Sequence, residues 1–289
     1  MELIIRNDHM QEVEGITAEY PYVLNSVDGR DTKVPWHWHE EVEFSYVVRG
    51  DLRVTVAGHS YVFGQGEGFY INTNILHTME PEDPEKEVLW HSFMFHPMFL
   101  GGHYKSVFET KYMAPVLKNK NYELAPFRGD DENQRQILQL LQQAAAMQGQ
   151  PGCEFRIRNC FSDIWLILME ELRELENSAK LLKPVSQERI QAMLTFIHTH
   201  YREKLTLEQI AGAAIVSKRE CIRCFRQCIQ KTPFEYLLDY RIRMAEKLLH
   251  TTALPVTEIA LQTGFSNSAY FTKLFRERTG CSPSLYRKG

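Results

Sequence analysis

The sequence predicts an α+β protein: an N-terminal β-barrel or sandwich with following helices, and an all-α C-terminal domain of two helix-turn-helix units joined by a long helix. Short alternating runs with glycine turns fill the first hundred or so residues. Two apolar stripes at helical spacing follow. Near the C-terminus, a pair of short helices around a tight turn occurs twice, with a period of about 50 residues.

The charge is divided unevenly along the chain of 289 residues. Ser186–Gly289 has 16 basic and 9 acidic residues, a net charge of +7, whereas Met1–Val185 has 17 basic and 28 acidic residues, a net charge of −11. A basic C-terminal part suits a polyanion such as DNA, and an acidic N-terminal part does not. The asymmetry would be unusual in a single-domain enzyme.

The N-terminus lacks a basic region followed by an apolar run, so we expect no signal peptide. The longest purely apolar run, Ile164–Met169, is too short to cross a bilayer, so we expect a cytoplasmic chain. Cys221, Cys224 and Cys228 recur on one face of a predicted helix. We expect them to pack in a core, since no second Cys or His pair stands nearby to favour a zinc or redox site.

Several strands are predicted before Pro97. Val42–Val48 alternates with a period of two, and Leu52–Val56 alternates again after a turn at Arg49–Asp51. Ala57-Gly58 is a hairpin signal. Further candidate strands are Tyr61–Phe63, Phe69–Ile71 and Val88–Phe95.

Metal-ligand residue types gather in this part of the chain. His37, His39 and Glu43 all have odd numbers, so on one strand they would share a face, and His77 follows later. The spacing His-x-His-x3-Glu-x6-Gly, ending at Gly50, is similar to the first cupin motif. GQGEGFYINTNILH resembles the second motif, with Asn74 where that motif has proline. In metal-binding cupins these positions hold a divalent metal.

Three interpretations of this cluster stay open: a metal site, a metal-free effector cavity, or satisfied core groups. The sequence assigns no cofactor to the protein, and a divalent metal is the one candidate for a cofactor. Aromatic side chains could provide apolar walls for a ligand such as a sugar. The candidate effector-binding residues are His37, His39, Glu43, Tyr46, His77 and Trp90, and the candidate metal ligands among them are His37, His39, Glu43 and His77.

Two helices are predicted at Asn133–Met147 and Glu154–Glu176. The apolar stripe of the second packs on the barrel, on the preceding helix or on a second copy of the chain. Lys111–Arg128 lacks a clear period and is predicted as loop and short turns. The predicted domains are residues 1–130 (barrel), 131–177 (helical packing or dimerisation segment), 178–186 (linker) and 187–289 (double helix-turn-helix).

The second helical unit spans Val256–Lys288. Ile259 and Ala260 face inward, Gly264 makes the sharp turn, and Ser266 is predicted to cap the next helix. Phe271, Leu274 and Phe275 give that helix one apolar face. Its opposite face shows the candidate DNA contacts Ser268, Ala269, Thr272, Lys273 and Arg276.

The first unit spans Leu205–Pro233 and repeats this pattern. Two capping boxes are predicted, Thr206 with Gln209 and Ser217 with Glu220. Ile215 and Gln230 replace the two glycines, so the first turn is either built differently or strained. The candidate DNA contacts are Lys218, Arg219, Ile222, Arg223 and Arg226.

At these residues the chain resembles the AraC/XylS family of bacterial transcription regulators, with Pro233–Leu249 as the joining helix. The resemblance implies a non-enzymatic regulator that binds double-stranded promoter DNA, is controlled by an effector in the barrel and forms a homodimer. RNA polymerase is a further candidate partner. The alternatives are a metal-dependent cupin enzyme or metal sensor fused to a DNA-binding domain, and a dimerising scaffold that senses nothing.

Overall fold

The chain forms two compact units in a computed structural model, one reaching to Gln187 and one beginning at Glu188. The described residues are 4–5, 11–29, 33–56, 58–119, 121–177 and 187–287. The predicted linker 178–186 lies outside them, as does Ala57 of the predicted hairpin signal, so these assignments stay predictions.

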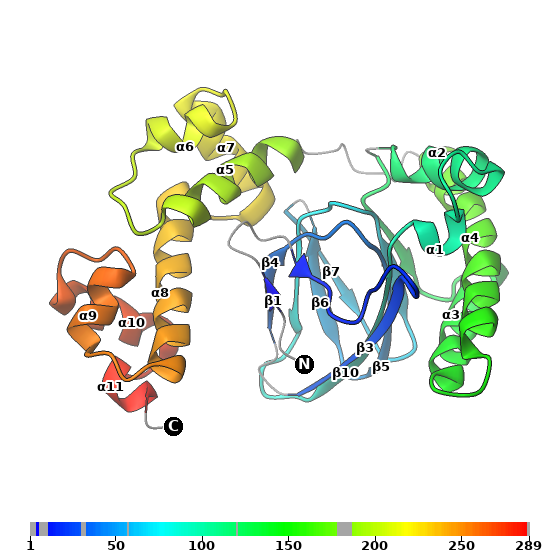
Figure 1. Ribbon diagram of the computed structural model, residues 1–289, viewed down its shortest axis with the longest axis horizontal. Coiled ribbons are helices and arrows are strands. Elements are labelled where there is room, and N and C mark those ends of the chain that lie inside the picture. Colours follow the sequence, from blue (N-terminus) through cyan, green and yellow to red (C-terminus); the bar gives the residue numbers. More distant parts are fainter. Residues whose placement is uncertain are drawn as a thin grey trace. The chain divides into compact units, whose positions relative to one another are not determined.

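Two antiparallel sheets face each other in the first unit (Figure 1). The larger sheet has the strand order β11-β8-β5-β10-β3, and the smaller has the order β4-β9-β6-β7. The predicted sandwich is confirmed. The strands are β3 (Tyr22–Gly29), β4 (Val34–His37), β5 (Val42–Arg49), β6 (Leu52–Val56), β7 (His59–Phe63), β8 (Gly68–Ile71), β9 (His77–Pro81), β10 (Val88–Phe95) and β11 (Leu124–Phe127), with a separate pair β1 (Ile4–Ile5) and β2 (Gln11–Glu12).

The space between the sheets is filled by side chains that alternate along the strands. Val47 of β5, Phe69 of β8 and Trp90 of β10 meet Val54 of β6 and Met79 of β9 in one buried apolar cluster. Side chains at the intervening positions of β5, β8 and β10 point to the other face of the larger sheet. That outer face must be covered, because it is apolar as well.

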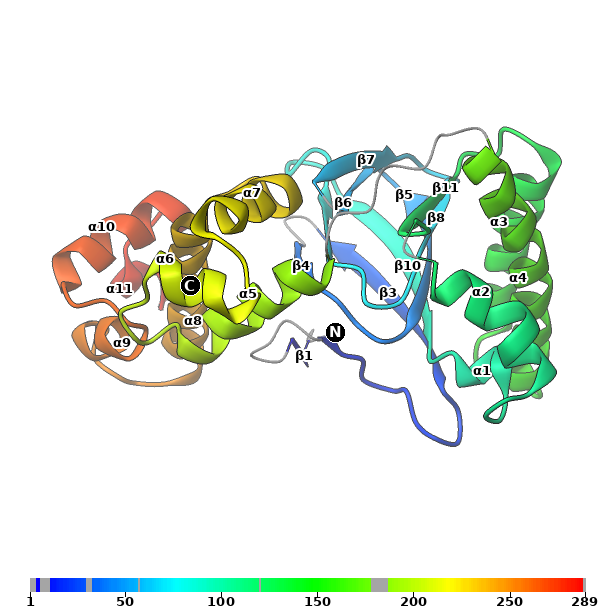
Figure 2. The same ribbon diagram turned by 90° about the horizontal axis from the view of Figure 1, so that it is seen from above.

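Two long helices, α3 (Glu132–Met147) and α4 (Cys153–Asn177), cover the outer face (Figure 2). Asp131 caps α3 by accepting a hydrogen bond from the backbone N–H of Gln134 at 2.8 Å. The predicted stripe of α4 packs against Phe44 of β5 and against α3, and Phe161 and Trp165 are almost fully buried in that cluster. The stripe is therefore used within the unit, and the alternative that a second copy covers it is wrong.

The prediction of loop and turns for Lys111–Arg128 is also wrong. This region contains part of a π-helix, η1 (Phe108–Met113), a short helix α2 (Ala114–Leu117) and strand β11. A further short helix, α1 (Met98–Gly101), precedes them. The elements are too short to show a period. β11 tolerates Pro126 because it lies at the edge of its sheet.

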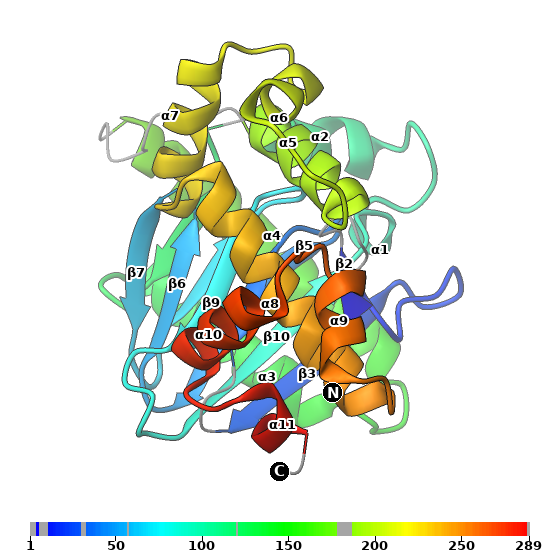
Figure 3. The same ribbon diagram turned by 90° about the vertical axis from the view of Figure 1, so that its left-hand side faces the viewer.

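The second unit is all-helical, and its longest helix lies between two helical pairs (Figure 3). The apolar residues predicted to face inward, Ile210, Ile259 and Phe271 among them, are fully buried. The predicted pair of helix-turn-helix units with a joining helix is confirmed. The helices are α5 (Gln187–His200), α6 (Leu207–Ala213), α7 (Lys218–Ile229), α8 (Pro233–Thr251), α9 (Val256–Gln262), α10 (Ser268–Thr279) and α11 (Pro283–Tyr286). None of the helices in the described ranges is long and apolar enough to cross a membrane.

The turns of the two units use the same left-handed backbone in spite of their different residues. Gly264 has φ +85°, and Ile215 takes φ +55° at the matching place. Gln230 and Gly280 match in the same way, at +60° and +82°. Of the two alternatives for the first turn, strain is therefore the outcome. A left-handed conformation costs a β-branched residue about 1–2 kcal/mol.

The predicted cap at Ser266 is wrong, because the second turn is one residue longer than the first. Ile215 and Gly264 are 49 positions apart, whereas the caps Ser217 and Asn267 are 50 apart. Asn267 accepts hydrogen bonds from the backbone N–H groups of the residues two and three positions on, at 2.9 and 3.0 Å. The capping box at Thr206 is confirmed.

Replacing Ile215 by glycine is expected to raise the free energy of unfolding of the second unit by about 0.5–1 kcal/mol. Glycine relieves the left-handed strain, and Ile215 is 94% exposed, so little burial is lost. Urea unfolding measures the change. Val216→Gly, next to it and without a positive φ, should instead lower stability, and equal effects of the two substitutions would contradict the strain.

Candidate functional site

Helix α7 presents one buried and one cationic face. Ser217 caps it, and Cys221, Cys224 and Phe225 are buried on the side that packs into the unit. The second half of the predicted capping box is wrong, because the Glu220 carboxylate binds an arginine rather than the Ser217 backbone. Of the predicted contacts, Ile222 is half-buried and the other four, Lys218, Arg219, Arg223 and Arg226, are exposed.

Helix α10 repeats this arrangement. Phe271, Leu274 and Phe275 are buried against α8 and α9. Ser268, Ala269, Lys273 and Arg276 are exposed and Thr272 is half-buried. A shallow groove on the outer face is lined by Ala269, Thr272, Lys273, Arg276 and Glu277.

The cations of the two helices differ in their partners. Arg223 forms two hydrogen bonds to Glu220, and Lys218 pairs with Glu208. Lys273 lies 3.9 Å from Glu277. Three more, Arg219, Arg226 and Arg276, form no ion pair with a described residue and are available to an external anion.

The cysteines of α7 belong to the core, as predicted. Cys221, Cys224 and Cys228 are at most 2% exposed. Burial raises the pKa of the Cys221 thiol to about 11, so this thiol is protonated near neutral pH. A thiolate site for zinc or redox chemistry is not favoured here.

In the barrel, the predicted histidines and glutamate come together, although not on one strand. His37 ends β4 and His77 begins β9, and the two are register partners in the smaller sheet. Glu43 belongs to β5 of the larger sheet, and His39 lies in the connection between. The prediction of one shared strand face is therefore wrong, because the chain passes from one sheet to the other after His39.

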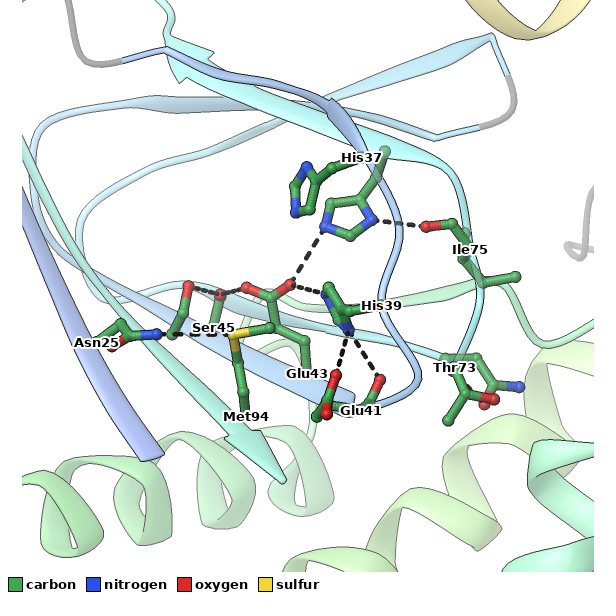
Figure 4. Close-up of polar contacts among 12 residues, drawn as sticks. Asn25, His37, His39, Glu41, Glu43, Ser45, Thr73, Ile75 and Met94 are labelled. Carbon is green, nitrogen blue, oxygen red and sulfur yellow. Dashed lines mark hydrogen bonds and ion pairs between the residues drawn. The ribbon is translucent and has the colours of Figure 1, made fainter. Parts of the chain in front are cut away.

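The cluster is compact and almost fully buried (Figure 4). Ligand atoms of His37, His39 and His77 all lie within 4.8 Å of one another. The Nε2 atoms of His39 and His77 are each 3.3 Å from Oε2 of Glu43. Burial opposes ionisation of Glu43, but the contacts with both histidines outweigh it and hold the pKa of the carboxyl well below its usual range.

Backbone carbonyls fix how the three imidazoles are protonated. His37 Nδ1 donates to the Pro35 carbonyl at 2.8 Å, His39 Nδ1 to that of Glu41 at 3.0 Å, and His77 Nδ1 to that of Ile75 at 2.7 Å. A carbonyl can only accept, so each Nδ1 carries a hydrogen, and Nε2 is the ring nitrogen whose lone pair a metal would take on replacing any proton there.

This arrangement fits a divalent metal. A histidine ligand commonly donates a hydrogen bond from one ring N–H to a backbone carbonyl, and this bond orients the other ring nitrogen toward the metal. The buried Nε2 of His77 faces Glu43 Oε2 at 3.3 Å without forming a hydrogen bond with it. Burial and the neighbouring His77 and His39 lower the pKa of His37 well below its usual value, which keeps it a neutral ligand. His37, His39, His77 and Glu43 would hold the ion, which would act as a Lewis acid toward an oxygen ligand.

A buried polar row beside Glu43 was not predicted. Ser45 donates to Glu43 Oε1 at 2.9 Å and lies 3.1 Å from Ser92 on β10. Asn25 of β3 is the register partner of Ser92. The period of two from Glu43 could have indicated Ser45, whereas Ser92 and Asn25 depend on a strand register that the sequence does not reveal.

The two aromatic candidates lie in different places. Trp90 is fully buried between the sheets, and its indole N–H has no hydrogen-bond partner within the described part of the chain. Tyr46 packs on the outer face, where its hydroxyl accepts a hydrogen bond from Gln142 of α3 at 2.8 Å. The assignment of Tyr46 to the barrel site is therefore wrong, because it is an even-numbered residue on a strand whose odd-numbered residues face inward.

The fold and the two helical faces define a protein with a β-sandwich domain and a double helix-turn-helix domain of the class that binds DNA. Comparison with known proteins agrees: residues 210–289 match the helix-turn-helix domain family, and residues 26–94 match the cupin domain family. The HTH-type transcriptional regulator YdeC of Bacillus subtilis is 29% identical over 263 residues, which cover 88% of this chain and 86% of that protein.

The arabinose operon regulatory protein of Escherichia coli is 24% identical, covering 82% of this chain and 80% of that protein. A solved structure of an AraC-type transcriptional regulator from Chromobacterium violaceum is 28% identical over 36% of this chain and 92% of that chain, with a TM-score of 0.35. Together, the two domain matches and the relatives agree with the resemblance to the AraC/XylS family, and the chain is a DNA-binding transcription regulator.

Proposed function

We propose that α7 and α10 are the two DNA-reading helices of this regulator. The observation that carries the proposal is the repeat itself: two capped helices of the same length each bury one face and expose a face that carries cations. Lysine and arginine contacts to phosphates supply affinity, and contacts to base edges supply specificity. The proposed contacts are Lys218, Arg219, Ile222, Arg223 and Arg226 in α7, and Ser268, Ala269, Thr272, Lys273 and Arg276 in α10.

Selection from a random DNA pool with the full chain tests this proposal and requires no known operator sequence. Two reading helices should enrich two short conserved blocks at one fixed spacing. A pool that stays random after several rounds at moderate salt would contradict it.

We propose that the barrel binds a small-molecule effector, such as a sugar, at His37, His39, Glu43 and His77. Burial of these side chains and the polar row of Ser45 beside them support a site that is specific for polar groups. Binding changes DNA affinity only when the effector prefers one arrangement of the protein over another.

The orientation of the three imidazoles favours a second candidate, a metal-dependent sensor or enzyme. Full-length relatives are regulators, so we infer sensing rather than catalysis. As in the family at large, we propose a cytoplasmic homodimer that acts at promoters, with RNA polymerase as a further partner.

Purified chain is expected to bind about one divalent ion, such as Zn²⁺ or Ni²⁺, measured by calorimetry and elemental analysis. His39→Ala or Glu43→Gln should weaken this binding by about 100-fold, because each removes an oriented ligand. His91→Ala is the control, since His91 bonds to Ser26 outside the cluster. Equal metal binding by all four proteins would remove the metal candidate.

A further inference from the structure

Glu220 connects the first reading helix to α5. Its Oε1 lies 3.3 Å from Arg189 Nη1 of α5 and accepts a 3.7 Å contact from the thiol of Cys224. The Glu220 side chain is 23% exposed, whereas that of Arg223 is 59% exposed. Glu220 is therefore fixed by contacts with Arg189 and Cys224 of its own unit, and Arg223 is the more exposed member of the pair.

The Glu220 carboxylate and the Arg223 guanidinium form a bidentate pair. Arg223 Nε donates to Glu220 Oε2 at 2.9 Å, and Nη2 donates to Oε1 at 2.6 Å. These bonds occupy one edge of the guanidinium. The other edge, formed by Nη1 and the second N–H of Nη2, makes no hydrogen bond to a described residue.

A planar guanidinium that is already hydrogen-bonded along one edge loses less rotational freedom when its other edge binds a base. Guanine presents two acceptors, O6 and N7, in the major groove, and a bidentate arginine contact is the commonest way to read them. A carboxylate near DNA also repels phosphates, so it disfavours a backbone contact by the same arginine.

We propose that Glu220 is a specificity-determining residue that positions Arg223 to read guanine. The inference rests on the proposed function of α7 as a reading helix. Glu220 itself touches no base: it acts through Arg223, anchored by Arg189. Arg219 and Arg226, which have no such partner among the described residues, remain suited to phosphates.

The test is random-pool selection with the full chain, followed by anisotropy titration on the enriched site and on a site with the guanine replaced. Wild type should prefer guanine at one position of the block read by α7 by about tenfold or more. Glu220→Gln should reduce this preference to less than about threefold while keeping affinity for the replaced site. Arg223→Lys, which keeps the charge but loses the bidentate pair, should reduce it equally.

Glu208→Gln is the matched control. It also removes one negative charge and the carboxylate partner of a cation on α7, here Lys218, and should leave the guanine preference unchanged. Unfolding midpoints check that all variants fold. An unchanged preference in Glu220→Gln, or an equal loss in Glu208→Gln, would overturn the inference while leaving the proposed function intact. A wild-type protein that enriches no sequence would overturn the proposed function instead, and the inference with it.

Discussion

Replacing both Lys273 and Arg276 by alanine is expected to weaken DNA binding by about 10- to 100-fold near 0.15 M salt. Both side chains are exposed, and they line one groove of α10. Arg276 has no ion-pair partner among the described residues, and the Lys273 pair at 3.9 Å is long. Each therefore keeps its charge for a phosphate, and fluorescence anisotropy with the selected site measures the loss.

A charge-matched control separates a local contact from a change in net charge. Lys86→Ala with Arg135→Ala removes the same two charges from the first unit, where each side chain pairs with an acid on the surface. This variant should bind DNA within about threefold of wild type. Equal weakening by the two double variants would indicate that α10 is not the contact surface.

Gly264→Ala is expected to destabilise the second unit by about 3 kcal/mol or more. A Cβ atom there would lie 2.6 Å from the backbone oxygen of Tyr201 and 2.9 Å from Nε of Arg241, at a φ of +85°. Arg241 is buried and donates to the carbonyls of Tyr201 and Glu203, each at 2.7 Å. The substitution would thus separate the turn of the second reading unit from α8, and thermal or urea unfolding measures the cost.

Gly212→Ala provides the comparison within the same unit. Gly212 lies in helix α6, and an added Cβ would meet nothing within 4 Å. Alanine should therefore stabilise the helix by up to about 1 kcal/mol. If both substitutions changed stability in the same direction, the close approach at Gly264 would not be the reason for glycine there.

The helical unit could be predicted well from the sequence because its signals are local. Capping residues, turn residues and apolar spacing fixed both ends of most helices to within a residue or two. The predicted cap at Ser266 was wrong because the two turns differ in length by one residue, and no local sequence signal reveals that difference. The region from Lys111 to Arg128 failed for another reason: short elements have no period, and the edge position of β11 depends on distant strands.

For the barrel site, the residues could be predicted from the sequence, but the contacts that orient them could not. Motif spacing predicted a site of four residues, and their side chains lie close together in the structure. They are His37, His39, Glu43 and His77. The carbonyl partners that orient the imidazoles and the serines beside Glu43 depend on strand register, which forms only in the folded sheet. Glu220 was predicted only as a capping partner, because its contact with Arg189 spans 31 residues.

The salt dependence of DNA binding by the full wild-type chain tests the central claim most directly. If two cationic helix faces contact phosphates, log Kobs on the selected site should fall linearly with log salt concentration, with a slope of about −3 to −6. The double variant of Lys273 and Arg276 should have a shallower slope by about 2. A slope near zero for wild type, or identical slopes for the two proteins, would contradict the account.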